Sequence, residues 1–435
     1  MSGQSLSIGV VARGSPRDEL MLETLDHQGV CYEHILPGSD RKYPAVLIPD
    51  DDSSAFELAS QSCENDENVI IAKKAMNLDF VLESLGGLRD EKADRYDVAV
   101  NLEEEKLMRV IGGTMASLGL PLVTKCFWPN RGTACCVLTH DVDLLTYSPF
   151  HLVVLKGSRK ASSFLSLVIG GLRGTDYGWN IPEILALEEG KGVKSTFFLR
   201  TWYPNHSERV SESVELIKSG GFEVGLHASE ASHLYRESLR KELERFSEIV
   251  GNRPTGVRHH ILKMSVPKTW AIEDEEGLLY DATRAWNKYF GYRAGICFPY
   301  RPFSESRLRL LELPTSFMDW TALNRGTRGS GIVSTLERIT RVADEYHGAM
   351  VANFHNTYLN GETFGDVVDA YKWLIDWASS SRRWVATAEE CATWWNYRAA
   401  QRPIIRLGTS RKVEVSSAVP LQAQMDGKQV QVGAR

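Results

Sequence analysis

The chain alternates short apolar runs with segments of helical periodicity along most of its length. In the first part, apolar runs at 6–12, 45–49, 68–72 and 97–101 predict strands, and the spacing over 18–28 predicts a helix. Alternating strands and helices are typical of an α/β sheet. Gly9 and Gly14 flank the first turn without forming a phosphate-binding motif. We therefore expect residues 1–125 to form a small Rossmann- or flavodoxin-like α/β domain of unknown role.

A second α/β series follows a boundary at 121–133, which contains Pro, Gly and Asn. Strands are predicted at 135–139, 195–199, 222–226, 256–261, 278–283, 349–354 and 384–387, with helices at 238–250 and 367–379. About seven strands, most of them followed by a helix, predict a distorted (β/α) barrel over 134–398. Residues 399–435 are rich in Pro, Val, Ser and Gln, and they predict a β-type or partly disordered tail.

Composition places the chain among folded soluble proteins with a large core. Hydrophobic residues make up 43% and charged residues 24% of the 435 residues. The net charge is -6, and the Lys and Arg residues form no basic stripe along the sequence, so nucleic acid is not an expected partner.

No apolar run reaches the roughly 18 to 20 residues of a membrane span. The start lacks the pattern of a secretion signal, and the seven cysteines form no C-x-x-C pair, so we expect a cytoplasmic protein. The pattern does not indicate an oligomeric state.

Ionisable side chains follow several of the predicted barrel strands. Asp141 and Asp143 come directly after the apolar run 134–138, and strand alternation places both carboxylates on one side. Two such carboxylates repel each other unless a cation or a proton lies between them. His227 follows the next predicted strand but one, at 222–226. A metal ligand beside a general base would use this arrangement, whereas a solvated turn is the plainer interpretation of the aspartates alone.

Two further strand ends carry the same residue types. Alternation along 256–261 places Arg258 and His260 on one face and His259 on the other. An arginine near a carboxylate lowers its pKa and fixes its orientation. His355 ends the predicted strand 349–354, and histidine can pass a proton to a leaving amine near neutral pH. In a barrel, these strand ends would meet at one face.

Five motifs in one order carry a resemblance to a known family. They are THDVD at 139–143, STFFL at 195–199, GFEVGLHAS at 221–229, GVRHH at 256–260 and NFHN at 353–356. In these motifs the chain resembles the polysaccharide deacetylase superfamily, carbohydrate esterase family 4, in its branch with a Thr-His-Asp-Val-Asp motif. The resemblance covers about 135 to 393 and leaves the N-terminal domain outside.

The resemblance implies a role for each matching residue. Asp141 would be the general base, Arg258 would hold it, and His355 would be the general acid. Asp143 and His227 would bind a divalent metal, with zinc the expected ion. The family's usual second histidine, four residues after the first, falls on Ala231.

Two residues could replace that missing ligand. His260 shares a strand with Arg258, and alternation aims it at the pocket, whereas His233 enters the following helix. We therefore expect Asp143, His227 and His260 to form the metal site, with His233 as the alternative. Two histidines and one aspartate leave a coordination position open for water, as catalytic zinc sites do.

The expected activity is metal-dependent hydrolysis in carbohydrate metabolism. The enzyme would remove an acetyl or other acyl group from an N-acylated amino sugar or a related glycan precursor. One alternative is a hydrolase of another non-peptide C–N bond. Another is a non-catalytic carbohydrate-binding or scaffolding barrel, because the family's usual third ligand is absent.

Overall fold

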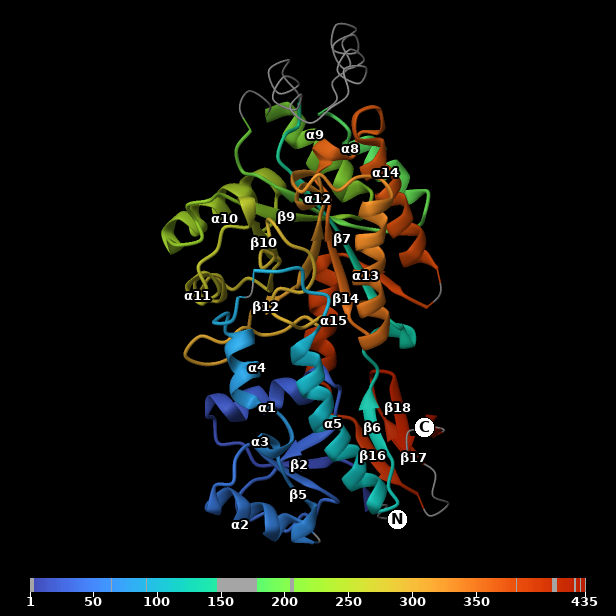
Figure 1. The fold of residues 1–435 in the computed structure, drawn as a ribbon. Coiled ribbons are helices and arrows are strands. Elements are labelled where there is room, and N and C mark those ends of the chain that lie inside the picture. Colours follow the sequence, from blue (N-terminus) through green and yellow to red (C-terminus); the bar gives the residue numbers. More distant parts are fainter. Residues whose placement is uncertain are drawn as a thin grey trace, which may run out of the picture.

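A computed structural model shows two α/β parts stacked end to end (Figure 1). It describes residues 4–63, 65–90, 92–146, 178–203, 207–380, 382–408, 413–425, 428–430 and 432–434. The N-terminal part lies below the larger part in this view, and both chain ends lie near the N-terminal part. Among the described helices, none combines the length and the apolar character needed to cross a membrane.

The N-terminal part contains a four-stranded parallel sheet of order β3-β2-β4-β5. Its strands are β2 (Ile8–Val10), β3 (Tyr32–His34), β4 (Val46–Ile48) and β5 (Val69–Ile71). Counted along the chain, this order is 2-1-3-4, as in flavodoxin-like sheets. The helices are α1 (Pro16–His27), α2 (Ser53–Ser62), α3 (Ala72–Ala75), α4 (Leu78–Leu85) and α5 (Ala99–Ser117). The predicted small α/β unit is thereby confirmed.

One predicted strand in this part is wrong. The apolar run at 97–101 does not form a strand, because helix α5 begins there at Ala99. Val98 and Val100 are buried at that helix start. The run therefore reflects the packing of a first helical turn, which a short sequence window cannot distinguish from a buried strand.

The larger part is built on a parallel sheet of order β12-β11-β10-β9-β8-β7-β14-β13, and β15 also pairs with β7. The strands are β7 (Cys135–Val142), β8 (Thr196–Leu199), β9 (Glu223–Ala228), β10 (Gly256–His259), β11 (Tyr280–Asp281), β12 (Leu311–Glu312), β13 (Thr315–Met318), β14 (Ala349–Asn353) and β15 (Trp384–Ala386). Only Leu313 and Pro314 separate the two end strands of this order. The Leu313 N–H donates to the Asp281 carbonyl at 2.8 Å. The sheet therefore curls round on itself, which confirms the predicted distorted barrel.

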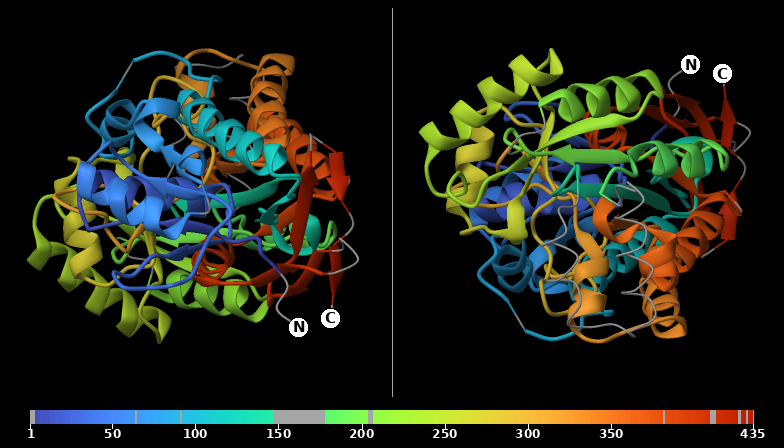
Figure 2. Two further views of the ribbon diagram at one scale, coloured as in Figure 1. Left: turned by 90° about the horizontal axis from the view of Figure 1, so that it is seen from below. Right: turned by 90° about the horizontal axis from the view of Figure 1, so that it is seen from above.

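Helices surround this curled sheet, as the view from above shows (Figure 2). They are α8 (Ile181–Glu189), α9 (Ser207–Ser219), α10 (Arg236–Val250), α11 (Lys268–Glu275), α12 (Asp319–Asn324), α13 (Ser330–Tyr346), α14 (Gly361–Ser379) and α15 (Ala388–Ala400). Helix α10 illustrates how the sequence builds them. Its buried residues are Leu239, Leu243, Phe246 and Val250, a spacing of one helical face, and Gly251 ends it with φ 85°.

The chain returns to the N-terminal part after the barrel. Strand β16 (Ile404–Leu407) pairs with β1 (Gln4–Ser5) and with β17 (Val413–Ser416). Strand β18 (Leu421–Met425) pairs with β6 (Leu122–Lys125) and with β19 (Lys428–Val430), and β20 (Val432–Ala434) pairs with β17. The stretch expected to be a boundary thus contributes β6 to a sheet with the end of the chain.

A buried charge network joins the two parts. Glu23 on α1 is fully buried and lies 3.2 Å from Arg301 and 3.0 Å from Arg307 of the barrel part. His27 lies between Glu23 and Glu104, at 3.1 and 2.6 Å. Removing one member of such a network leaves a buried charge unpaired, which typically costs about 3–5 kcal/mol. These buried ion pairs thus bind the N-terminal part to the barrel part.

Candidate active site

The carboxyl ends of β7, β9, β10 and β14 meet around one pocket of about 380 Å³. Its lining residues are Asp141, Asp143, His227, His260, Ile261, Leu262, Asn287, Met318, Trp320, His355 and Tyr358. The volume is that of a small-molecule site. In parallel barrels this end of the strands is where catalytic residues gather.

Asp141 is buried at the end of β7 and is held from two sides. The Arg258 guanidinium donates to its Oδ1 at 3.0 Å, and the Asn353 amide donates to its Oδ2 at 2.8 Å. Burial raises the pKa of Asp141, but neighbouring positive charge, including that of the Arg258 guanidinium, outweighs burial and lowers the pKa below its ordinary value. The carboxylate is therefore ionised and has a fixed orientation.

Arg258 reaches across the barrel interior to make this contact. It is fully buried, and its guanidinium also donates to Thr139 Oγ1 at 2.7 Å, to Thr315 Oγ1 at 3.0 Å and to the Ala282 carbonyl at 2.9 Å. It lies 4.5 Å from the centre of the Phe198 ring. Because its donors bind four residues, on β7, on β13 and directly after β11, Arg258 positions Asp141 rigidly.

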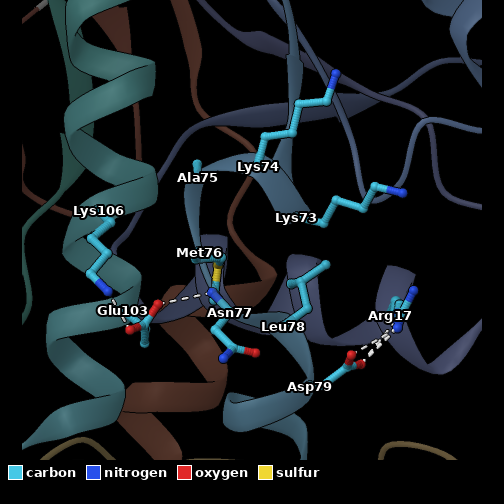
Figure 3. Close-up of a pocket in the computed structure, with 10 residues that line it drawn as sticks. All are labelled: Arg17, Lys73, Lys74, Ala75, Met76, Asn77, Leu78, Asp79, Glu103 and Lys106. Atoms are coloured by element: carbon cyan, nitrogen blue, oxygen red, sulfur yellow. Dashed lines mark hydrogen bonds and ion pairs between the residues drawn. The ribbon is translucent and has the colours of Figure 1, made fainter.

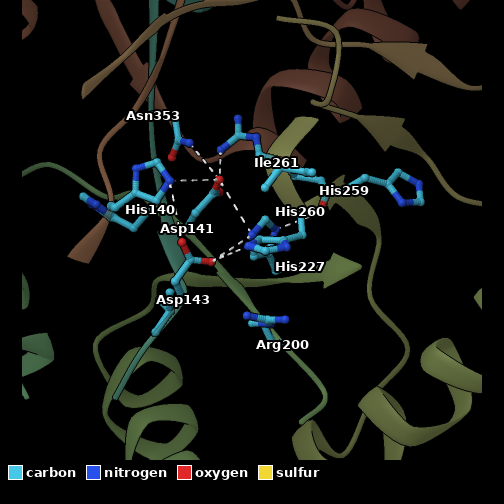
Figure 4. A network of polar contacts seen from close by, with 12 residues as sticks. His140, Asp141, Asp143, Arg200, His227, His259, His260, Ile261 and Asn353 are labelled. Carbon is cyan, nitrogen blue, oxygen red and sulfur yellow. Dashed lines mark hydrogen bonds and ion pairs between the residues drawn. The ribbon is translucent and has the colours of Figure 1, made fainter. Parts of the chain in front are cut away.

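Asp143, His227 and His260 bring one ligand atom each to the same point (Figure 4). All three atoms lie within 4.8 Å of one another. Asp143 Oδ1 is 3.3 Å from His227 Nε2 and 3.6 Å from His260 Nε2. The expected set is thus assembled, although His260 comes from the turn His260–Leu262 after β10, where Ile261 has φ 53°.

The protonation of these side chains fits a bound divalent cation. His227 Nδ1 lies 2.9 Å from the Arg258 carbonyl, so Nδ1 carries the proton and Nε2 offers its lone pair. His260 Nδ1 lies 3.3 Å from Glu230 Oε1, while its Nε2 faces Asp143. Asp143 Oδ1 and His227 Nε2 are buried without a hydrogen-bond partner among the described residues. Two orphaned buried acceptors that face each other suit a cation between them.

His355 lies close to both aspartates. Its Nε2 is 3.9 Å from Asp141 Oδ2 and 3.9 Å from Asp143 Oδ2. Its Nδ1 is 2.6 Å from Asp319 Oδ1, and its backbone N–H donates to Asp319 Oδ2 at 2.7 Å. Burial would lower the pKa of His355, but the carboxylate of Asp319 raises it to about 9. The imidazole is therefore a cation with a proton to give at neutral pH.

Asp319 and Asn353 are functional candidates that the sequence analysis missed. Asp319 is buried at the start of α12, directly after β13. The strand before it, Thr315–Met318, is short and half polar in sequence, so it gave little signal for a carboxylate at a strand end. Asn353 carries no charge and stands inside a motif that drew attention only to His355, so its contact with Asp141 had no signal.

Other histidines near the motifs lie outside the ligand group. His233 Nδ1 contacts the Glu230 carbonyl at 2.6 Å, and His233 does not join the three clustered ligand atoms. His140 points away from the pocket, where its Nε2 contacts Glu188 at 2.8 Å. His259 contacts Glu273 at 2.8 Å, and burial lowers the pKa of His259 to about 3. The structure thus gathers His260 and leaves out the alternative ligand His233.

An aromatic wall completes the pocket. The rings of Trp320 and Tyr358 stack at 18° with 6.2 Å between their centres. Trp320 is 43% exposed, so much of its surface is open to solvent. Exposed aromatic faces are suited to stacking on apolar ring faces. Trp320 lines this pocket, whereas the exposed Trp202 lines another one.

A pocket of about 490 Å³ in the N-terminal part offers no comparable chemistry (Figure 3). Its charged groups mostly neutralise one another: Arg17 pairs with Asp79 at 2.8 Å, and Lys106 pairs with Glu103. Lys73 pairs with Asp50 at 3.5 Å. Among the described residues, the candidate catalytic and metal-binding groups therefore lie in the barrel pocket.

Comparison with known proteins gives structural matches only. No protein-family model and no curated protein sequence matches the chain. A proposed polysaccharide deacetylase from Mycobacterium smegmatis is 21% identical with a TM-score of 0.45, covering 63% of this chain and 94% of its own. The PuuE allantoinase is 17% identical with a TM-score of 0.45, covering 63% and 93%. A pseudoenzyme of carbohydrate esterase family 4 from Bacillus anthracis is 12% identical with a TM-score of 0.34, covering 61% and 66%.

All three structures are less than 25% identical to this chain, with TM-scores below 0.5. Any functional assignment therefore has to rest on the atoms of the pocket itself.

Proposed function

We propose that the chain is a metal-dependent deacetylase that hydrolyses the acyl–nitrogen bond of an N-acylated amino sugar or a related glycan precursor. One observation carries this proposal: Asp143, His227 and His260 form a ligand group, and both an ionised carboxylate, Asp141, and a protonated histidine, His355, lie next to it. Amide hydrolysis needs both a group that accepts a proton from water and a group that donates one to the amine.

The metal site would be formed by Asp143, His227 and His260, with zinc the expected ion. When bound, such an ion supplies Lewis acidity toward an acyl oxygen and an attacking water. Asp141 is kept out of the ligand group by Arg258 and Asn353, which occupy its two oxygens at 3.0 and 2.8 Å. We assign Asp141 as the base that accepts the water proton.

His355 would complete the reaction. An amine is a poor leaving group unless its nitrogen is protonated as the C–N bond breaks. With its pKa raised to about 9 through Asp319, His355 holds a proton at neutral pH. Its Nε2 faces both aspartates, so this proton lies on the pocket side of the ring. Trp320 and Tyr358 would stack against the sugar.

Release of acetate tests the proposal directly. Zinc-loaded protein is expected to release acetate from N-acetylated amino sugars, and removal of the metal with a chelator should stop the release. His355→Ala should lower the rate by about 100- to 10,000-fold. Acetate and free amine, quantified by NMR, give the readout. Metal binding without acetate release from any N-acyl sugar would favour the non-catalytic barrel, and ring opening of cyclic amides would favour the alternative hydrolase.

The Asp319→Asn variant should shift the pH dependence of turnover. Asp319 raises the pKa of His355, and the proposed acid works only when protonated, so activity falls as the pH rises through that pKa. Replacing the carboxylate with an amide lowers this pKa, and the basic limb of kcat should move down by about 1 to 2 pH units. Rate profiles between pH 6 and 10 measure it; an unmoved basic limb would separate His355 from the acid role.

A further inference from the structure

Arg200 stands level with two members of the ligand group on neighbouring strands. The parallel register pairs Val142 with Leu199 and Leu199 with Leu226. The next residues along these three strands are Asp143, Arg200 and His227. Arg200 thus occupies the central one of three adjacent strand ends, between two of the metal-ligand candidates.

The side chain of Arg200 is directed toward this end of the barrel. Phe198 lies beneath the Arg258 guanidinium, and β8 ends at Leu199, directly before Arg200. Figure 4 shows Arg200 beside His227 and His260. The guanidinium therefore lies close to the ligand group without being one of its members.

Within the described part of the chain, the Arg200 guanidinium has no ion pair and no side-chain hydrogen bond. Its backbone N–H donates to the Tyr203 hydroxyl at 3.0 Å, and that hydroxyl donates to the Val142 carbonyl at 2.6 Å. These bonds hold the loop 200–203 against β7. The other arginine of the site, Arg258, uses donors on four partners. Arg200 is half-buried beside a ligand group that suits a metal cation, and among the described residues its guanidinium has no partner for its N–H donors.

We propose that Arg200 binds an anionic group of the substrate, so that the preferred substrate is an N-acyl amino sugar carrying a phosphate or a carboxylate. This inference rests on the proposed deacetylation at the same site. A guanidinium recognises both anions through paired, charge-assisted hydrogen bonds. An anion between Arg200 and the metal site would reduce the repulsion between the guanidinium and a bound metal ion. A neutral sugar cannot do so.

Ligand-observed NMR on the zinc-loaded full-length protein tests this inference, because binding and acetate release are seen in one tube. The probes are N-acetylglucosamine, its 6-phosphate and 1-phosphate, and N-acetylmuramic acid, which distinguish phosphate from carboxylate. The wild type should bind at least one charged sugar about 10- to 100-fold more tightly than the neutral one. High salt should reduce this preference.

Three variants assign the preference to its residue. Arg200→Gln should abolish the preference for the charged sugar, whereas Arg200→Lys should retain part of it. Arg245→Gln is the matched control: Arg245 is exposed and lines a separate pocket beyond the same loop, so the preference should persist. Equal affinities for charged and neutral sugars, or a preference that survives Arg200→Gln, would overturn the inference. Arg200-dependent binding without acetate would uphold the inference and count against the deacetylase.

Discussion

Asp141→Asn should lower kcat by about 100- to 10,000-fold, the usual contribution of a positioned acid or base. The amide has nearly the same shape as the carboxylate but cannot accept the water proton. Arg258 and Asn353 both donate to Asp141, so the new amide also brings an N–H group toward existing donors. Rates of acetate release at saturating substrate, measured from pH 5 to 9, provide the test.

A loss of folding must be separated from a loss of the base. Asp141 is a buried partner of Arg258, and breaking such a pair can cost about 3–5 kcal/mol of stability. Asp281→Asn is the matched control, because Asp281 is also fully buried but lies outside the pocket. Burial raises the pKa of Asp281 to about 6, so an amide there replaces a group that is readily neutral. A folded Asp141→Asn protein with wild-type kcat would remove Asp141 from the base role.

The barrel could be predicted from sequence wherever a strand forms one uninterrupted apolar run. Strand β7 was predicted at 135–139 and spans Cys135–Val142; β14 was predicted at 349–354 and spans Ala349–Asn353. Strands β12 and β13 were missed because Pro314 divides them and each is short. A proline normally argues against a central strand, yet here it stands at the closure of the barrel, between two strands.

The placement of His260 shows the limit of reasoning from strand alternation. The prediction assumed that the strand continues to Ile261, whereas β10 ends at His259 and the chain turns. Ile261 has φ 53°, a conformation that costs a β-branched residue about 1–3 kcal/mol and persists only when its surroundings impose it. Asn287 supplies one such contact by donating to the Ile261 carbonyl at 2.8 Å. A local window contains no signal for a backbone conformation that is set by a residue further along the chain.

The ligand group predicts a strong and selective effect on metal content. Asp143→Ala, His227→Ala and His260→Ala should each weaken zinc affinity by about 100-fold or more, since changing residues that merely orient a ligand already costs about 10- to 100-fold. Elemental mass spectrometry after dialysis should find about one zinc per wild-type chain and much less in these variants. Zinc at 100 times its Kd should also stabilise the wild type by about 2.7 kcal/mol.

His233→Ala is the control that distinguishes His260 from His233 as the third metal ligand. His233 was the alternative third ligand, but its Nδ1 contacts the Glu230 carbonyl at 2.6 Å and its ring lies 6.3 Å from that of His259, away from the ligand group. This variant should keep its zinc. Zinc lost in His233→Ala and kept in His260→Ala would reverse the assignment. Zinc absent from the wild type even after reconstitution would leave Asp143 Oδ1 and His227 Nε2 as orphaned acceptors without a ligand, and the barrel would then be a binding module.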